Sequence, residues 1–307
     1  MRAVGFWGFG GPEVLRVVEL GEPSAGPGEL RIRVAAAAVN PTDLLFRSGR
    51  RTVDMRGVAP PYVPGMDLAG WVDAIGDGVT SMRVGDAVIA VTSPPPNGPG
   101  AQAEFVVVPS ASVATAPRGL ALIEATTLGM NGLTALQALD LLALPRGATL
   151  GVTGAAGAVG GYAVQLGKTA GLRVIAHGRE RDRSDVLRLG ADVFVSHAED
   201  MGGLDGLVDT ALLGPPAMRA IRDGGAVATL RGGSAEAQPG ISIRPVAVSR
   251  YLRESQRLAE LSQLAEQGKL HLRVAARLPP DQAAQAHRRL EAGGVRGRLV
   301  IEFERRA

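Results

Sequence analysis

The chain has 307 residues, of which 46% are hydrophobic and 21% are charged, and its formal net charge is +3. This length is more than one typical domain needs, so we expect two domains with substantial cores. The sequence holds no cysteine, which excludes disulfides, thiolate zinc sites and thiol nucleophiles. We predict no metal site, because the four histidines show no metal-ligand spacing: His177, His197, His271 and His287.

Charge and hydropathy patterns exclude two further kinds of partner. Nearly all basic residues are arginines, but no basic run is interleaved with aromatic residues, so we expect no nucleic-acid partner. No run of about 18 apolar residues predicts a membrane span, and the first residues lack the layout of a signal peptide. We therefore expect a cytoplasmic protein with no membrane partner.

The first 120 residues have the pattern of a β-rich domain. Short alternating or β-branched runs, broken by Gly and Pro, predict strands at residues 30–34, 70–75, 86–91 and 103–108. The segment 293–303 ends in an apolar strand that we expect to return to this domain. We predict that residues 1–120 and 268–307 form the first domain.

From about Leu120, predicted strands alternate with predicted helices. The strands are expected at residues 149–153, 173–177, 192–197, 206–210, 226–230 and 241–248, and the helices at 158–170, 182–189 and about 250–267. This alternation is typical of right-handed βαβ units around a parallel sheet. We predict that residues 121–267 form a second, α/β domain.

A glycine-rich turn, residues 151–160, lies between the first predicted strand and the first predicted helix of that domain. Gly154, Gly157 and Gly160 fall where a tight turn would bring backbone N–H groups close to a pyrophosphate. The helix that follows would point its N-terminal amides at the anion. The turn predicts dinucleotide binding, and its alternative is an ordinary strand-to-helix connection; no Gly-Lys-Ser/Thr follows, so a nucleotide-hydrolysing P-loop is excluded.

The residues after the second strand of this domain bear on the choice of dinucleotide. Residues 178–183 read Gly-Arg-Glu-Arg-Asp-Arg. Arginines at this place favour NADPH, because a guanidinium binds the 2′-phosphate in bidentate fashion. Glu180 is the opposing observation, since an acid here can bind the ribose hydroxyls of NAD, although we expect it to face solvent. The alternative is that these arginines form only a solvated face.

Motifs along nearly the whole chain resemble the medium-chain dehydrogenase/reductase superfamily, in its zinc-independent quinone oxidoreductase (ζ-crystallin-like) branch. The similar segments are 39–43 (Val-Asn-Pro-Thr-Asp), 64–70 (Pro-Gly-Met-Asp-Leu-Ala-Gly), 100–109, 130–137, the glycine-rich turn, 189–192 (Leu-Gly-Ala-Asp), 208–210 (Val-Asp-Thr) and 286–298. The resemblance implies a fold of the α/β class, with a GroES-like β-barrel domain, a Rossmann doubly wound parallel-sheet domain, and an active site between them.

The resemblance also implies a chemistry. Zinc-dependent members of the superfamily carry a Cys/His/Glu set and a Gly-His-Glu motif, and this chain has Asn40, Asp43 and Asp67 in those regions instead. Without a Lewis acid, alcohol oxidation is a poor expectation. The resemblance instead implies an NADPH-dependent reductase that transfers hydride to a quinone or α,β-unsaturated carbonyl without a metal.

Site residues are carried over from the same resemblance. The cofactor-binding set would be Asn40, Asn131, Thr134, Gly154, Ala155, Ala156, Gly157, Ala158, Val159, Gly178, Arg179, Arg183, His197 and Arg298. Asn40 would lie near the nicotinamide and the acceptor carbonyl, with Asn131 and Thr134 beside the ring. His197 would stand near the adenosine phosphate, and Arg298 would keep the positive charge of a lysine in the family.

Three residues near the expected reaction centre have competing interpretations. Tyr62 could donate a hydrogen bond or proton to the reduced acceptor, or its ring could simply be packed. Asp43 could relay a proton, but the role of N-cap after Asn40 is the simpler interpretation. Asp67 is expected to be structural, buried and hydrogen bonded.

Two other functions stay open at this point. One is an enoyl-thioester reductase, and the other is an NADPH-binding module without significant turnover, such as a redox sensor or an RNA-binding protein of the ζ-crystallin type. The strand at 241–248 resembles the edge strand through which relatives pair, so we also expect a homodimer.

Overall fold

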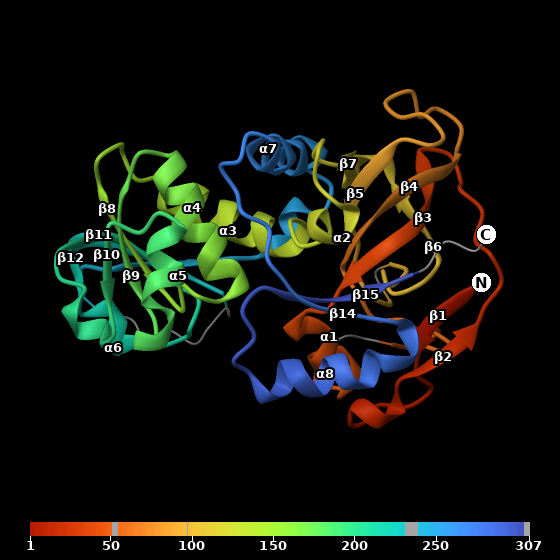
Figure 1. Cartoon of the computed structure of the whole chain (residues 1–307), viewed down its shortest axis with the longest axis horizontal. Helices are drawn as coiled ribbons and strands as arrows, with labels where there is room; N and C mark the ends of the chain where they lie inside the picture. Colours follow the sequence, from red (N-terminus) through yellow and green to blue (C-terminus); the bar gives the residue numbers. More distant parts are fainter. Residues whose placement is uncertain (51–54, 97, 231–238, 304–307) are drawn as a thin grey trace. The chain divides into compact units, whose positions relative to one another are not determined.

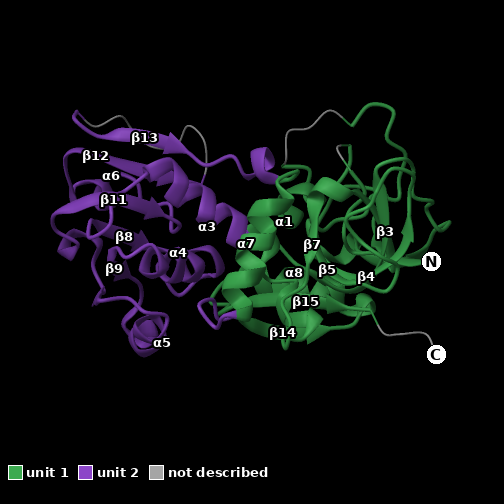
Figure 2. Cartoon of the chain, turned by 90° about the horizontal axis from the view of Figure 1, so that it is seen from above, with its two compact units in different colours: residues 1–130, 252–266, 272–307 green, residues 131–251, 267–271 purple. Residues whose placement is uncertain are grey.

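The computed structural model describes residues 1–50, 55–96, 98–230 and 239–303. The chain divides into two compact units, which are described separately (Figure 2). The first unit comprises residues 1–130, 252–266 and 272–307, and the second comprises residues 131–251 and 267–271. Residues 121–130 and 252–266, which the sequence placed in the second domain, group with the first unit because their helices α2 and α7 pack on its strands.

The first unit is built on a seven-stranded sheet and a two-stranded ribbon. The sheet has the order β14-β15-β3-β4-β5-β7, with β6 paired to β3, and only its β14–β15 pair is parallel. β1 and β2 form the antiparallel ribbon. The strands are β1 (Arg2–Gly5), β2 (Arg16–Glu19), β3 (Glu29–Ala38), β4 (Asp67–Ile75), β5 (Ala87–Val91), β6 (Phe105–Pro109), β7 (Val113–Thr115), β14 (Val274–Leu278) and β15 (Arg298–Glu302).

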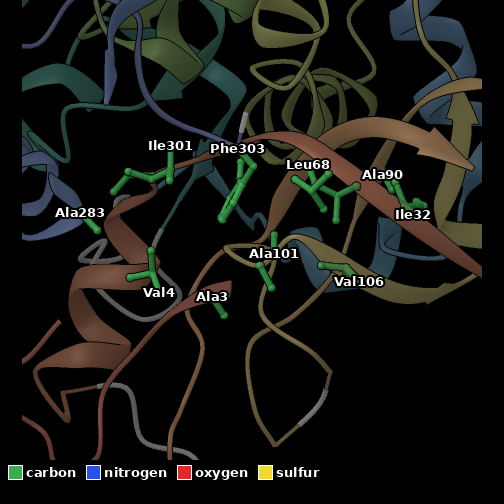
Figure 3. Packing of buried hydrophobic residues seen from close by; sticks show 14 of the residues in the cluster. Ala3, Val4, Ile32, Leu68, Ala90, Ala101, Val106, Ala283, Ile301 and Phe303 are labelled. Atoms are coloured by element: carbon green, nitrogen blue, oxygen red, sulfur yellow. The ribbon is translucent and has the colours of Figure 1, made fainter. Parts of the chain in front are cut away.

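The helices of this unit cover its core. They are α1 (Pro41–Arg47), α2 (Leu122–Ala125), α7 (Ser255–Glu266) and α8 (Ala283–Ala292). Along β3, Leu30, Ile32 and Val34 are buried at every second position, as a strand with one face on a core requires. The core also takes Val4 from β1 and Ile301 from β15, so it joins both ends of the described chain (Figure 3).

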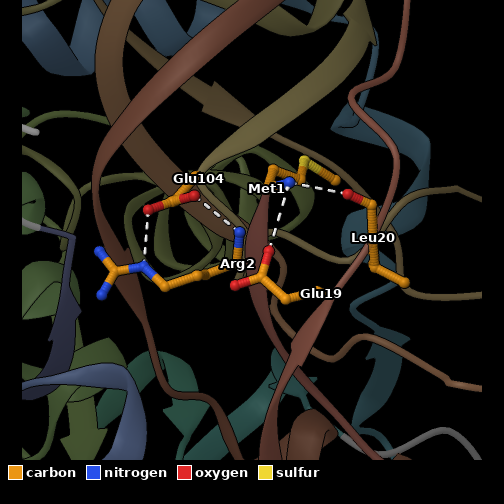
Figure 4. Close-up of polar contacts among 5 residues, drawn as sticks. All are labelled: Met1, Arg2, Glu19, Leu20 and Glu104. Carbon is orange, nitrogen blue, oxygen red and sulfur yellow. Dashed lines mark hydrogen bonds and ion pairs between the residues drawn. The ribbon is translucent and has the colours of Figure 1, made fainter.

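The N-terminal ribbon is fixed by polar contacts as well. Glu104 accepts hydrogen bonds from the backbone N–H of Arg2 at 2.6 Å and from its Nε at 2.8 Å (Figure 4). The amino group of Met1 donates to the carbonyl of Leu20 at 2.7 Å and lies 3.6 Å from the carboxylate of Glu19. These contacts tie β1 to β2 and to the segment that leads into β6.

The second unit is a six-stranded parallel sheet with helices (Figure 1). The strand order is β10-β9-β8-β11-β12-β13, and every neighbouring pair is parallel. The order reverses direction at β8, which is the topology of a doubly wound fold. Its elements are α3 (Gly129–Leu142), which starts in the first unit, β8 (Thr149–Thr153), α4 (Ala158–Thr169), β9 (Arg173–His177), α5 (Arg183–Arg188), β10 (Val193–Val195), β11 (Leu204–Asp209), α6 (Pro215–Met218), β12 (Ile221–Thr229) and β13 (Ser242–Pro245).

Several predicted elements differ from the observed ones at their ends. β8 and β9 have the predicted bounds, and β15 returns to pair with β3 as expected. β12 begins at residue 221 rather than 226, because Ile221 pairs with Leu204 on β11. The register then shifts, and the exposed residues 222–224 lie between this pair and the next one. The predicted helix 250–267 begins only at Ser255, after a short 3₁₀ turn. Within the described residues, no helix is long and apolar enough to cross a membrane.

Candidate functional site

Four polar side chains gather inside the first unit, and we call them the Asp67 network: Asn40, Asp43, Asp67 and Arg298. Asn40 follows β3 and Asp43 lies in the first turn of α1, while Asp67 opens β4 and Arg298 opens β15. All four are buried, with exposed fractions of 5% or less. The fold therefore brings together three predicted site residues, Asn40, Asp43 and Arg298, and adds Asp67, which is buried and hydrogen bonded as predicted.

Hydrogen bonds fix the amide of Asn40 at both ends. Its Nδ2 donates to Asp67 Oδ2 at 2.6 Å, and its Oδ1 accepts from Nη2 of Arg298. Asp67 Oδ1 also accepts from the backbone N–H of Met130, in the first turn of α3. A flipped amide would place its donor against the guanidinium, so the orientation of Asn40 is set by the two charged partners.

Asp43 does not form the N-cap that the sequence suggested. Asn40 occupies the N-cap position of α1, and Asp43 stands three residues later. The Asp43 carboxylate accepts from the backbone N–H of Asn40 at 2.8 Å and from that of Gly65 at 3.0 Å. Asp43 thus bonds the N-cap backbone from the N3 position, which is one half of a capping box, and it also ties α1 to the segment before β4.

The two carboxyl groups of the network are hard to ionise. Burial raises the pKa of Asp43 to about 7, and the neighbouring Asp67 carboxylate adds to the rise. The two backbone hydrogen bonds of Asp43 and the Arg298 guanidinium act in the opposite direction on that pKa. Burial also raises the pKa of Asp67 to about 6 against the hydrogen bonds that it accepts. Both carboxyl groups therefore have a pKa closer to neutral pH than an exposed aspartate has.

Tyr62 belongs to a cluster of aromatic rings in the first unit. Its ring is stacked on Phe9, with centroids 5.8 Å apart and planes at 9°, and it meets Phe6 and Phe46 edge-on at 5.5 and 6.2 Å. Its hydroxyl donates to the carbonyl of Val58 at 3.3 Å. These contacts account for a packed ring, and proton donation by Tyr62 stays a prediction.

The glycine-rich turn of the second unit leaves β8 and enters α4. Gly154 has a φ of +60°, and the N–H of Ala155 donates to the carbonyl of His177 on β9 at 3.0 Å. Gly157 is the N-cap of α4 and has no side chain to cap it. A Cβ on Gly160 would lie 2.3 Å from the Gly154 carbonyl oxygen, so only glycine allows the turn to close this tightly.

This geometry fits the pyrophosphate of a dinucleotide. In the first turn of an α-helix, the backbone N–H groups have no carbonyl of the same helix to bond. In α4 these groups include the N–H of Ala158 and that of Val159. The partial positive charge of the helix N-terminus adds to the attraction for an anion. Gly157 at the N-cap carries no side chain, so a phosphate can approach the backbone there.

The arginines after β9 have unequal surroundings. Arg183 donates through Nε and Nη2 to the carboxylate of Glu180, the latter at 2.9 Å. Its guanidinium also lies 4.7 Å from the centre of the Phe194 ring and donates to the Phe194 carbonyl at 3.3 Å. Gly178 makes room for the same ring, because a Cβ there would lie 3.2 Å from it. Arg179 and Glu180 are exposed, so the expectation that Glu180 faces solvent is confirmed.

The other predicted cofactor residues lie on separate elements of the second unit. Asn131 is buried in the first turn of α3, and Thr134 is half-buried on the same face of that helix, three residues on. His197 is exposed and precedes a short 3₁₀ turn after β10. Their contacts with a cofactor stay predictions. In the part of the chain that the structure describes, no three His, Asp or Glu side chains are placed to hold a metal ion.

Sequence reasoning missed two buried polar groups. Asp209, at the end of β11, accepts a hydrogen bond from Thr153 Oγ1 at 2.5 Å. The motif at 208–210 does not predict this partner, because Thr153 lies on another strand. In the first unit, buried Arg47 forms an ion pair with Glu291. A pair separated by 244 residues gives no local signal in the sequence.

Comparisons with known proteins match two stretches of the chain. Residues 26–118 match the alcohol dehydrogenase GroES-like domain, and residues 184–301 match a family described as zinc-binding dehydrogenase. Among solved structures, an NAD-dependent alcohol dehydrogenase is 31% identical with a TM-score of 0.87, and the match covers 99% of this chain and all of that one. The chain belongs to the medium-chain dehydrogenase/reductase superfamily. Its first unit contains the GroES-like domain and its second unit the Rossmann-like sheet, as the resemblance implied.

Other relatives place this superfamily member in the quinone oxidoreductase-like branch. Quinone oxidoreductase of Rattus norvegicus is 34% identical over 202 residues, which are 65% of this chain and 59% of the rat protein. The 2-methylene-furan-3-one reductase of Solanum lycopersicum is 29% identical over 98% of this chain and 79% of its own. The quinone oxidoreductase from Coxiella burnetii has a TM-score of 0.88 and 27% identity over 99% of both chains. A mycobacterial protein solved with NADPH has a TM-score of 0.84 and 26% identity, over 99% of this chain and all of its own.

The Asp67 network predicts that stability falls as pH rises from about 4 to about 7. In this window the folded chain holds protons on Asp43 and Asp67 that the unfolded chain has released. Each group therefore lowers the free energy of unfolding by up to about 1.4 kcal/mol per pH unit. Asp43→Asn removes one titration, so its free energy of unfolding is expected to decline less steeply over this window. Chemical denaturation at a series of pH values measures both slopes.

His287 provides an internal check on that measurement. Burial, with a smaller effect of Arg47, lowers the pKa of His287 to about 3, so its contribution to stability is lost as pH falls below about 6.5. This opposite slope is present in both proteins and cancels in their difference. Equal slopes for the wild type and Asp43→Asn would contradict the raised pKa of Asp43.

The glycine turn yields a second prediction. Gly160→Ala is expected to lower the free energy of unfolding by roughly 1–3 kcal/mol, because the added methyl must displace the Gly154 carbonyl. Gly157→Ala is the matched control: its Cβ would lie 3.1 Å from the same oxygen, and we expect a loss below about 1 kcal/mol. Urea unfolding measures both, and equal losses would show that the approach at Gly160 is not the constraint.

Proposed function

We propose that this protein is an NADPH-dependent reductase that transfers hydride to a quinone or an α,β-unsaturated carbonyl without a metal. The observation that carries the proposal is the uncapped N-terminus of α4 behind the closed glycine turn, a seat for a dinucleotide pyrophosphate. The relatives supply the reaction class. The rat and Coxiella proteins are named quinone oxidoreductases, and the tomato protein is named for a 2-methylene-3-one, which is an α,β-unsaturated ketone.

Two observations, one on a protein of similar fold and one on this chain, support NADPH as the dinucleotide. The mycobacterial protein of similar fold was solved with NADPH. In this chain, exposed Arg179 and Arg183, whose guanidinium lies over the Phe194 ring, follow β9, where the adenosine end of a dinucleotide binds in such sheets. A 2′-phosphate would compete with Glu180 for Arg183 and would gain a bidentate contact.

The reduced nicotinamide, when bound, supplies hydride from its C4 atom, and the conjugated acceptor takes up the developing negative charge. The chain's own residues position the reactants. Asn40, whose amide is oriented by Asp67 and Arg298, would direct its second Nδ2 proton to the acceptor carbonyl. Asp43 would exchange the proton that completes the reduction, because its pKa lies near neutral pH.

We also propose that the protein is a homodimer formed through β13. Within the described residues this strand ends the six-stranded sheet and pairs only with β12, so its outer backbone groups are open to a second strand. Pairing of two copies about a twofold axis would cover that edge.

Steady-state oxidation of NADPH tests the reaction class. A simple benzoquinone and an alkyl vinyl ketone are each expected to accelerate the loss of NADPH absorbance at least about tenfold over the mixture without protein, as enzymes of ordinary efficiency do. A mixture with protein but without acceptor is the control. Tight NADPH binding with no acceleration by any quinone or enone would overturn the proposed activity.

Cofactor preference provides a fourth prediction. Arg179→Ala and Arg183→Ala are each expected to weaken NADPH binding roughly tenfold, because a charged hydrogen bond to phosphate is lost, and to leave NADH binding nearly unchanged. Arg188→Ala is the matched control, since Arg188 forms a similar ion pair with Asp185 on the exposed side of α5. Calorimetric titration gives the dissociation constants. If the ratio of the NADPH constant to the NADH constant is unchanged in both variants, the arginines do not explain a preference for NADPH.

A further inference from the structure

Helix α1 carries two of the proposed reaction residues at its start. Asn40 is its N-cap, and Asp43 stands in its first turn. The helix has only seven residues, Pro41–Arg47, and helices this short are unstable in water without tertiary contacts. The positions of Asn40 and Asp43 therefore depend on the contacts that hold α1 in the first unit.

The last residue of α1 is a buried cation. The side chain of Arg47 is 3% exposed, and its Nη2 donates to the carboxylate of Glu291, near the end of α8. In the described part of the chain, Nε and Nη1 of Arg47 are buried without a hydrogen-bond partner. Because a buried charge without a partner is costly, this guanidinium depends on Glu291 both for its neutralisation and for its orientation.

His287 lies beside this ion pair but cannot replace it. His287 and Glu291 are four residues apart on α8, which places them on the same face of that helix. The His287 ring is buried, and its pKa is lowered to about 3 by burial and, to a smaller degree, by Arg47. A neutral imidazole cannot compensate the charge of Arg47, so that role falls to Glu291.

The segment 291–298 contacts α1 at both of its ends. α1 and α8 lie side by side (Figure 1). Glu291 binds Arg47 at the end of α1, and Arg298, seven residues later at the start of β15, donates to Oδ1 of Asn40 at its beginning. Phe46 packs in the core between these two contacts. Apolar packing is not directional, whereas hydrogen bonds between charged groups fix a geometry.

We propose that Arg47 and Glu291 are positioning residues for the reduction, which act by fixing α1 so that Asn40 and Asp43 meet the acceptor. The inference rests on the proposed function, in which these two residues serve the reaction. A seven-residue helix is about 10 Å long, so a shift at Arg47 moves the whole helix. Displacement of a reacting group by about 1 Å can lower a rate about 100-fold. A buried ion pair adds little net stability, and its main effect here is on where α1 lies.

Steady-state kinetics of three variants test this role. Glu291→Ala leaves the Arg47 guanidinium unpaired, and we expect it to lower kcat with a quinone or enone roughly tenfold, while the Kd for NADPH stays within about twofold. Glu291→Gln keeps an oxygen that accepts from Arg47, so its kcat is expected within about threefold of the wild type. Arg47→Met removes the pair without leaving a buried charge, and it provides the same test if Glu291→Ala does not fold.

Asp73→Ala is the matched control. Asp73 pairs with Arg31 at 2.6 Å in the same unit, and the pair joins β3 to β4 without involving α1 or α8. This variant also leaves an arginine unpaired, but its kcat is expected to stay within about twofold of the wild type. All assays are run well below the melting temperature of each variant, where destabilisation alone does not lower kcat.

A second readout does not depend on activity. The chain has three asparagines, so labelling asparagine with ¹⁵N gives few side-chain amide signals, and Asn40→Ala identifies the one from Asn40 by its loss. The Nδ2 group of Asn40 donates to Asp67 at 2.6 Å, which protects its protons from exchange with water. We expect Glu291→Ala to shift this signal and to speed its exchange, and Asp73→Ala to leave both unchanged.

The outcomes separate this inference from the proposed function. If Glu291→Ala and Arg47→Met keep the kcat and the Asn40 signal of the wild type, or if Asp73→Ala changes them as much, the inference is overturned and the proposed function stands. If the wild type reduces no quinone or enone, the proposed function is overturned, and with it a role of the pair in that reaction. A lowered kcat with unchanged NADPH affinity and a shifted Asn40 signal supports the inference.

Discussion

A single buried carboxylate, that of Asp67, constrains segments that are far apart in the sequence. It accepts hydrogen bonds from Asn40, after β3, and from the backbone of Met130, in the first turn of α3. Asn40 is bonded in turn by Arg298, at the start of the last described strand. A carboxylate without partners would be costly to bury. The hydrogen bonds that Asp67 accepts therefore stabilise the positions of these segments. Asn40 and Arg298, two candidate residues of the first unit, share this one constraint.

The fold was predictable where the sequence pattern is local. β8 and β9 are apolar runs bounded by turn residues, and both have the predicted bounds. The first-unit strands β1, β2, β7 and β14 were not predicted, because their short runs are only partly apolar and depend on their partner strands. The early start of β12 depends likewise on pairing with Leu204, which no periodicity encodes. Tertiary pairing decides such ends.

The site was predictable to a similar degree. Glycine spacing identified the turn after β8, and the arginines after β9 were found from their place in the chain. The spacing of Asn40 and Asp43 fits either an N-cap or its reciprocal partner, and only the structure distinguishes them. The sequence did not show that Arg183 pairs with Glu180 or that Asp209 accepts from Thr153. Contacts across strands follow register, which one sequence does not reveal.

The pairing of β15 has a consequence for how the chain matures. Ala36 lies opposite Glu302 in the sheet. The first unit therefore pairs a strand that is synthesised early with one that is synthesised much later. Residues 131–251 of the second unit are continuous, and only residues 267–271 come later. Domains generally fold as units during synthesis, so the second unit gains most of its contacts while the end of β3 still lacks β15. An unpaired strand edge can associate with other chains, and in this protein β15 covers that edge of β3.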